Sequence, residues 1–278
     1  MDEMPGPLPS EVDLSQPNIA RMWDYLLGGR VNVEADREAA RRLMKSMPEL
    51  PGVLRANRAF AARAVRLLAK AGIRQFLDLG SGLATVHPAH EVVGEGDAEA
   101  RVLYVDNDPV VAAHNKLLVP TRTCAVLRAD LRDTAAVLES PQAQRLFDLN
   151  QPVAVLLIAV LDSLPHADRP ADIVARYRDA LVAGSCVALT HAVGTQPHTS
   201  TIQAARAYAK HVAPVHLRTR SEIAGFLNGW DVLYPGLVPT PDWRPGPAVA
   251  DHEATWLSGL AAVAWKPPQL AANRSAPG

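Results

Sequence analysis

Short apolar segments alternate with amphipathic segments between residues 74 and 191, and this alternation restricts the fold of the chain more than any other feature. One of them, 153–160, is apolar throughout, as is typical of a central parallel strand that is covered on both faces. Strands that alternate with helices predict an α/β fold with an open, doubly wound and mostly parallel sheet. The segments expected to form its strands are 74–79, 102–105, 125–128, 153–160 and 186–191.

The remaining segments complete a single α/β unit that is preceded by helices. Edge strands are expected at 231–234 and 261–265. Apolar residues at helical spacing, together with cap signals, predict the helices. These are 18–27, 34–47, 53–71, 85–94, 109–118, 134–139, 141–147, 168–182, 199–211 and 219–227. The expected boundaries are a tail at 1–16, N-terminal helices at 17–72, an α/β domain at 73–266 and a second tail at 267–278.

Composition narrows the classes of function. Lys and Arg number 28 and Asp and Glu number 29, a net charge of −1, so no basic excess predicts binding of nucleic acid. Cys124 and Cys186 lie in apolar runs, which favours buried reduced thiols. The acidic N-terminus does not resemble a signal peptide, and no apolar run reaches membrane-spanning length, so we expect a cytoplasmic protein. His87 and His90 have no third ligand at a metal-binding spacing, so no metal is expected.

Carboxylates follow three successive predicted strands. Asp78 precedes the turn Gly80-Ser81-Gly82, Asp106-Asn107 ends the second strand, and Asp130 follows the third. Doubly wound sheets bind ligands at the carboxyl ends of their strands, so these groups are expected at one site. The turn departs from the dinucleotide pattern because Thr85 stands where the third glycine would be, and the chain has no phosphate-binding P-loop.

The three carboxylates match a ligand that carries an amine, a diol and an adenine but no phosphate. Asp78 would attract a cationic or amino group, Asp106 would accept hydrogen bonds from a ribose diol, and Asp130 would accept from the adenine amine. S-adenosylmethionine has these groups. The alternative interpretations are an ordinary strand-to-helix turn, helix capping by Asp108 alone, and a solvated polar loop around Asp130.

The order of these motifs resembles class I S-adenosylmethionine-dependent methyltransferases. More narrowly, the chain resembles the actinobacterial S-adenosyl methyltransferase family that was long catalogued as a domain of unknown function. The resemblance spans roughly residues 17–266, and Asp-Tyr-Leu-Leu-Gly-Gly at 24–29 is its most specific motif. Its supporting segments are 20–29, 32–40, 76–85, 90–93, 105–111, 129–133, 235–239 and 243–245.

This resemblance implies a Rossmann-like class I methyltransferase fold in which the N-terminal helices form a lid over the cofactor. Helices around Arg21, Tyr25 and Gly28-Gly29 would fold over the site, although the family pattern Tyr-Asp-Tyr is Trp23-Asp24-Tyr25 here. The implied product is S-adenosylhomocysteine. The residues expected to bind the cofactor are Arg21, Tyr25, Asp78, Gly80, Ser81, Gly82, Asp106, Asn107, Asp130, Leu131 and Ala159.

Candidate general bases lie after the fourth and fifth predicted strands and in the lid. They are Asp162, His191 and Tyr25, with His166 as a further candidate. The alternatives are a helix cap at Asp162, a solvated loop residue at His166 and a packed aromatic at Tyr25. By family analogy, we expect methyl transfer to a small molecule, in secondary metabolism. The alternative is a protein that binds the cofactor or its product without methyl transfer, as a sensor or a cyclase. The sequence names neither the acceptor nor the oligomeric state.

Overall fold

A computed structural model describes residues 13–96, 99–194, 214–245 and 259–268. An 8-stranded sheet forms its centre, with strand order β3-β2-β1-β4-β5-β8-β6 and with β7 paired to β8. The first five strands in sequence are parallel, whereas β8 is antiparallel to β5 and to both short strands. This arrangement confirms the predicted α/β fold. The strands are β1 (Gln75–Leu79), β2 (Arg101–Asp106), β3 (Cys124–Arg128), β4 (Ala154–Leu157), β5 (Cys186–His191), β6 (Asp231–Val232), β7 (Val238–Pro239) and β8 (Leu260–Trp265).

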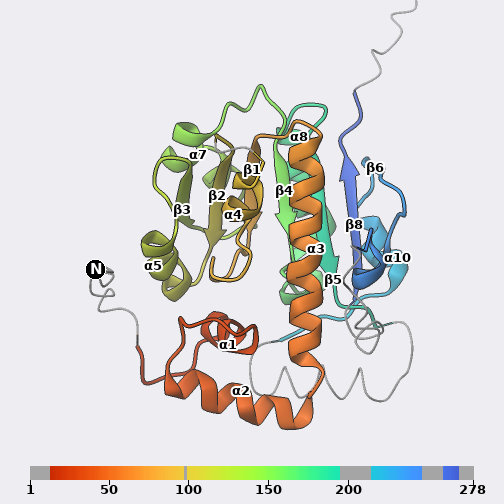
Figure 1. Ribbon diagram of the computed structural model, residues 1–278. Helices are drawn as coiled ribbons and strands as arrows, with labels where there is room; N and C mark the ends of the chain where they lie inside the picture. The colour runs from red at the N-terminus through yellow and green to blue at the C-terminus, as the bar shows by residue number, and fades with distance from the viewer. Residues whose placement is uncertain (1–12, 97–98, 195–213, 246–258, 269–278) are drawn as a thin grey trace, which may run out of the picture.

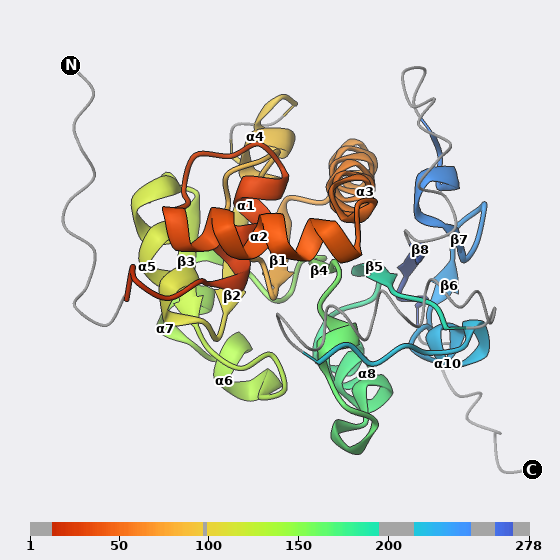
Figure 2. The same ribbon diagram turned by 90° about the horizontal axis from the view of Figure 1, so that it is seen from below.

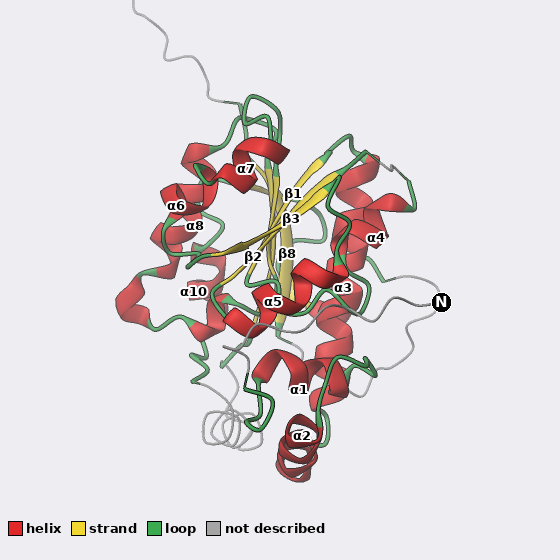
Figure 3. Ribbon diagram, turned by 90° about the vertical axis from the view of Figure 1, so that its left-hand side faces the viewer, coloured by secondary structure: helices red, strands yellow, loops and turns green. Residues whose placement is uncertain are grey.

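Helices cover both faces of the sheet (Figures 2 and 3). On one face pack α3 (Leu50–Lys70), α4 (Ala89–Gly94) and α5 (Pro109–Leu118). On the other pack α6 (Thr134–Leu138), α7 (Pro141–Leu146), α8 (Pro170–Ala180) and α10 (Arg220–Gly225). Alternate strand residues point to opposite faces, so Phe76 joins the first core and Leu77 the second. The expected helix at 199–211 lies outside the described residues.

Several elements are shorter than the sequence predicts, and the two that matter for the site are β4 and α4. The apolar run 153–160 forms a strand only over Ala154–Leu157, because Ala159 has a φ of 52° and turns the chain away from the sheet. Helix α4 begins at Ala89 rather than at residue 85, since Pro88 is in an extended conformation with ψ of 153° and stands at the N-cap. Because of the positive φ of Ala159, the chain turns sharply at the end of β4 into the loop that follows it.

The N-terminal helices α1 (Ile19–Leu26) and α2 (Glu34–Ser46) lie beyond the carboxyl ends of the parallel strands (Figure 1). A buried ion pair joins them, with Arg21 Nε 2.7 Å from Asp36 Oδ2. Asn18 caps α1, and its Nδ2 donates to Asp108 Oδ2 at 2.7 Å. Because Asp108 also caps α5 after β2, this bond ties the helix pair to the end of the sheet.

Within the described ranges, no helix has the length and apolarity needed to cross a membrane. Cys124 and Cys186 are both free and buried in strands, as the sequence predicts.

Replacement of Asp36 should destabilise the protein strongly. In Asp36→Asn the guanidinium of Arg21 stays buried without its counter-charge, and we expect a loss of about 3 kcal/mol in the free energy of unfolding. Urea denaturation measures this loss. The matched control is Glu38→Gln, because this carboxylate is exposed on the same helix and its replacement should change stability by less than about 0.5 kcal/mol. Equal effects of the two substitutions would contradict the role given to the ion pair.

Candidate functional site

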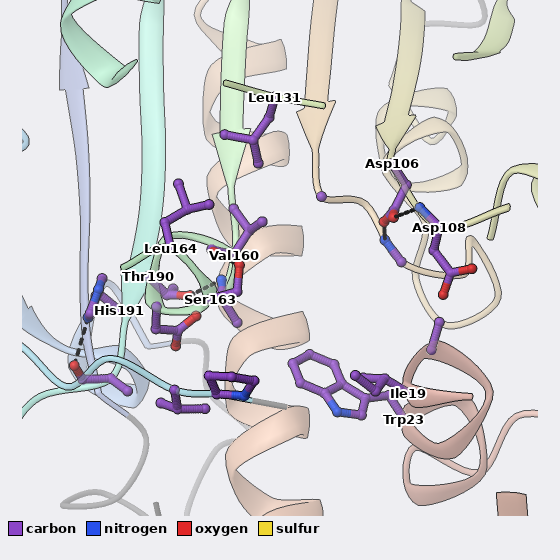
Figure 4. Close-up of a pocket in the computed structure, with 18 of the residues that line it drawn as sticks. Ile19, Trp23, Asp106, Asp108, Leu131, Val160, Ser163, Leu164, Thr190 and His191 are labelled. Carbon is purple, nitrogen blue, oxygen red and sulfur yellow. Dashed lines mark hydrogen bonds between the residues drawn. The ribbon is translucent and has the colours of Figure 1, made fainter. Parts of the chain in front are cut away.

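A cavity of about 490 Å³ lies at the carboxyl ends of the parallel strands, between them and the N-terminal helices (Figure 4). A smaller cavity of about 60 Å³ adjoins it beside α3. We call them the large and the small cavity. Residues from α1, α3, the turn after β1 and the turn after β4 border both, so they form one continuous site. These shared residues are Trp23, Leu54, Asn57, Gly80, Gly82 and Ala159.

Most of the residues predicted to bind a cofactor or to act as bases border these cavities. The large cavity is lined by Gly80, Gly82, Asp106, Asn107, Asp130, Leu131, Ala159, Asp162 and His191. The small cavity is lined by Asp78 and Ser81, together with the shared glycines and Ala159. The structure thus brings together groups that are spread over more than 100 residues of sequence.

Arg21 and Tyr25 were predicted to contact the cofactor, but neither is among the residues that line the two cavities. Arg21 is 1% exposed and is engaged with Asp36. The ring of Tyr25 lies on another side of α1, where the Cζ of Arg41 is 5.9 Å from its centroid. Residue Trp23 borders both cavities instead, because residues two apart on a helix point about 200° away from each other.

The glycine turn after β1 requires both of its glycines. Gly80 and Gly82 have φ values of 66° and 60°, which favour glycine. A Cβ at Gly80 would lie 2.2 Å from Cγ2 of Val160, so the turn also packs closely against the end of β4. Asn115 of α5 fixes the turn from behind: its Nδ2 donates to Gly82 O at 2.8 Å and its Oδ1 accepts from Ala84 N at 2.9 Å. Asn115 is not among the site residues expected from the sequence, although an Asn within the mostly apolar helix 109–118 is a usable signal, and the structure shows that it is fully buried.

Asp106 links the end of β2 to the glycine turn. Its Oδ2 accepts from Gly82 N and its Oδ1 from Asp108 N, both at 3.0 Å. Burial raises the pKa of this carboxyl, while the two backbone N–H groups act against the rise. A carboxylate has about four lone-pair positions, so Asp106 can still accept hydrogen bonds from a ligand in the large cavity.

Asp78 and Arg58 bring opposite charges to the small cavity. Burial raises the pKa of Asp78 to about 6, the charge of Arg58 opposes this shift, and the charge of Asp106 adds to it. In the described part of the chain, no hydrogen bond reaches the Asp78 carboxylate. Arg58 Nη2 donates only to the carbonyls of Ser81 and Leu83, both at 3.4 Å. The small cavity can therefore hold a ligand that carries both an ammonium and a carboxylate group.

Asp130 borders the large cavity but already has a strong partner. The guanidinium of Arg132 binds it through Nε, at 2.9 Å from Oδ2, and lowers its pKa by hydrogen bonding. Arg132 Nη1 also donates to Asp168 at 2.7 Å. These bonds make the loop after β3 a polar wall of the cavity. The hydroxyl of Tyr177, in α8, donates to Leu131 O of the same loop at 2.9 Å.

The turn after β4 carries Asp162 to the wall of the large cavity. The backbone N–H of Ala159 donates to Thr190 Oγ1 at 2.9 Å, which supports the positive φ of this residue. Asp162 lies within the 3₁₀ helix η1 (Leu161–Ser163), and Val160 rather than Asp162 is its N-cap. Its carboxylate has no hydrogen bond or ion pair from the described residues.

His191 lies at the cavity wall, but both of its ring nitrogens are already engaged. Nδ1 lies 2.7 Å from Ala192 O and must donate to it, so Nε2 is the acceptor of the hydrogen bond from Arg218 Nη1 at 2.8 Å. Burial lowers the pKa of the ring, which is therefore neutral at pH 7. In this conformation neither nitrogen is free to take a proton from a ligand, so the geometry favours a structural role for His191 over the expected role as a base. The other histidine considered, His166, is exposed near Glu222 and does not line the cavity.

Arg218 is a buried residue that is not among the site residues expected from the sequence. It is 2% exposed and donates to Leu161 O at 2.8 Å and to Leu164 O at 2.6 Å, as well as to His191. These bonds fix the turn that carries Asp162. No local pattern around Arg218 signals this contact, since its partners lie more than 20 residues away.

Asp78 should make the stability of the ligand-free protein pH-dependent. The native state holds this proton more tightly than the unfolded chain, so ionisation destabilises the fold as the pH rises from about 4 through about 6. Asp78→Asn removes this effect and should be more stable than the parent at pH 8, by up to about 3 kcal/mol. At pH 4 the difference should vanish. Urea denaturation at both pH values tests this, with exposed Asp231→Asn as control; a difference that does not vary with pH would refute it.

Comparison with known proteins places this site in a family. A sequence model described as S-adenosyl methyltransferase matches residues 5–267. A DUF574 family protein from Streptomyces avermitilis is 36% identical, with a TM-score of 0.86 and coverage of 92% of this chain and 99% of its own. A proposed methyltransferase from Thermobifida fusca is 39% identical, with a TM-score of 0.84 and coverage of 93% and 98%. No curated protein matches the chain.

The family model covers most of the chain, and both relatives match over almost their whole length. The site agrees with this match: Asp78 without a hydrogen bond from the described residues, the turn Gly80-Ser81-Gly82 and the carboxylate at the end of β2 border the two adjoining cavities. The chain therefore belongs to the S-adenosyl methyltransferase family and is an S-adenosylmethionine-dependent methyltransferase.

Proposed function

We propose that the protein methylates a small organic molecule of secondary metabolism, bound in the large cavity beside the cofactor. The observation that carries this proposal is the cavity itself, which joins the polar strand ends to an apolar region between α1, α3 and residues 214–217. Its volume of about 490 Å³ lies within the range of small-molecule sites. The family match favours methyl transfer over the alternative of a protein that only binds the cofactor. The setting in secondary metabolism is carried over from the family resemblance.

The residues present fit S-adenosylmethionine. Asp78 would accept hydrogen bonds from the ammonium group of its amino-acid end, and Arg58 would pair with its carboxylate. Asp106 would accept from the ribose diol. Asp130, which keeps lone pairs beyond its bonds to Arg132, and Leu131 would border the adenine. Gly80 leaves room for close approach of a ligand to the backbone, and Asn107, Ser81 and Ala159 complete the walls.

The cofactor supplies a methyl group that is activated by a sulfonium, so the protein mainly orients the reactants and excludes water. Such orientation contributes about 7–11 kcal/mol to catalysis. The N-terminal helices would act as the lid, with Ile19 and Trp23 facing the cavity from α1 (Figure 4). Arg21 would be a positioning residue, because its ion pair with Asp36 sets the orientation of this helix. Tyr25 would support the same helix from outside the cavity.

Asp162 is the proposed catalytic residue. It is the carboxylate on the turn after β4, it borders the large cavity, and it has no hydrogen bond from the described residues. It would face the acceptor, either to take its proton or to pair with its charge. Arg218 and His191 would keep the turn in place without touching the reactants.

Cofactor binding gives the first test of this assignment. Calorimetric titration should detect binding of S-adenosylmethionine and S-adenosylhomocysteine but not of NAD. Asp106→Ala should weaken binding of both sulfur ligands by about 1–3 kcal/mol, because the diol loses its acceptor and Gly82 loses its anchor. Asp231→Ala, at an exposed site on β6, is the control. Unchanged affinity in Asp106→Ala would show that the diol assignment is wrong.

Turnover gives the second test. With an acceptor found by screening for the mass of an added methyl group, Asp162→Asn should lower kcat by about 10²-fold or more. Its affinity for S-adenosylhomocysteine should stay within about twofold of the parent, a difference of only about 0.4 kcal/mol. A variant that retains full kcat would remove Asp162 from the catalytic residues, whereas a parallel loss of cofactor affinity would indicate a structural role.

A further inference from the structure

The large cavity has an apolar end that the proposed cofactor contacts do not use. It is formed by α1, by the start of α3 with the loop before it, by the turn after β4 and by residues 214–217. We call it the acceptor pocket; its apolar walls include Trp23, Met47, Leu54, Leu164, Val215 and Leu217. Figure 4 shows Trp23 on one side of this region and Leu164 and Val160 on the other. An acceptor held here must have a hydrophobic body.

The charges on the cavity wall select against an anionic acceptor. Within the described residues, five carboxylates line the large cavity: Asp106, Asp108, Asp130, Asp162 and Asp168. The cation among these lining residues, Arg132, is bound to Asp130 and Asp168. His191 is neutral, and buried Arg218 directs its guanidinium at two carbonyls and at this ring. A carboxylate or phosphate on the acceptor would therefore enter a field of its own sign without a cation to pair with.

The polar side chains at the acceptor pocket offer hydrogen-bond acceptor atoms, so the methyl-accepting substrate should carry a hydrogen-bond donor. The Asp162 carboxylate accepts no hydrogen bond from the described residues, although the charge of Arg218, whose guanidinium donates elsewhere, acts on it from nearby. Asn57, 7% exposed, borders both cavities; its Nδ2 donates to Val53 O at 3.1 Å, and its Oδ1 is buried without a donor. The bond to Val53 fixes which amide atom is the oxygen, since two oxygens would repel each other there. A ligand that carries N–H groups would satisfy acceptors of this kind.

On these observations we propose that the acceptor is a hydrophobic amine and that the methyl group goes to its nitrogen. This rests on the proposed function. The amine binds as an ammonium ion and first loses one proton through Asp162 to solvent water, which frees the lone pair of its nitrogen. The lone pair then forms the new N–CH₃ bond, the C–S bond breaks, and its electron pair stays on sulfur. Positive charge thus moves from sulfur to nitrogen, and the product is an N-methylammonium ion beside Asp162. Carboxylates stabilise this charge, whereas methylation of a hydroxyl would require an anionic oxygen in the same acidic surroundings.

A matched ligand series tests the acceptor class by binding as well as by turnover. The probes are ω-phenylalkylamines from benzylamine to 4-phenylbutylamine, each with the alcohol and the carboxylate of equal chain length. They are titrated calorimetrically into the full chain saturated with S-adenosylhomocysteine, and incubated with S-adenosylmethionine for mass spectrometry. The best amine should bind at least about tenfold more tightly than its alcohol and its carboxylate, and should be methylated on nitrogen.

The Asp162→Asn variant shows whether the carboxylate is responsible. It should lose about tenfold in affinity for the amine while its affinity for the alcohol is unchanged. Asp231→Asn, which removes an exposed carboxylate remote from the cavity, should leave both affinities as in the parent. Equal binding of amine and carboxylate, methylation on oxygen, or failure of every amine to bind would overturn the amine proposal. Failure of S-adenosylhomocysteine to bind in the loading step would instead overturn the proposed function.

Discussion

The hydrogen bond from the Gly82 N–H to the Asp106 carboxylate joins the turn after β1 to the end of β2, and the shape of the site depends on it. Asn115 holds the same turn from the other side through Gly82 O and Ala84 N. Together they keep two glycines at positive φ and leave Gly80 against Val160, where a side chain could not fit. Because these groups are satisfied within the protein, the turn is formed before any ligand arrives, and binding need not supply the free energy to order it.

Buried polar contacts attach the N-terminal helices to this frame. The Arg21–Asp36 pair fixes α1 against α2, and Asn18 links α1 to Asp108 at the beginning of α5. Such contacts restrict geometry more than hydrophobic packing does, since each donor must meet a particular acceptor. They determine that Trp23 faces the cavities while Tyr25 does not. Most of the motif that is most specific to the family resemblance, at 24–29, accordingly has a structural role, and only its Leu27 borders a cavity, the small one. Asp24 is buried, accepts a hydrogen bond from Asn32, and leaves no space for a Cβ on Gly29.

The buried carboxylate of Asp78 lowers the stability of the ligand-free protein in a way that favours ligand binding. A carboxylate with a pKa of about 6, buried beside a second carboxylate, destabilises the ligand-free protein at neutral pH. An ammonium group in the small cavity would offset this cost, so Asp78 is better suited to a bound ligand than to the empty site. Arg218 and the neutral His191 are different. The guanidinium of Arg218 and the ring nitrogens of His191 are directed at neighbouring backbone carbonyls and at each other, which is the arrangement expected of residues that hold a loop.

The sequence by itself determined the order of strands and helices and the positions of the strand-end carboxylates. Parallel strands separated by helices must place their carboxyl ends on one edge, so Asp78, Asp106 and Asp130 could be assigned to one site from spacing alone. Tertiary structure alone decided which side chains face the cavities and which are already paired. Arg58 of α3 brings its charge near Asp78 without a hydrogen bond to it, Arg218 engages a histidine 27 residues before it, and Arg132 pairs with Asp130. These contacts depend on packing between distant segments, whose relative positions are set by the whole core and leave no periodic signal in the chain.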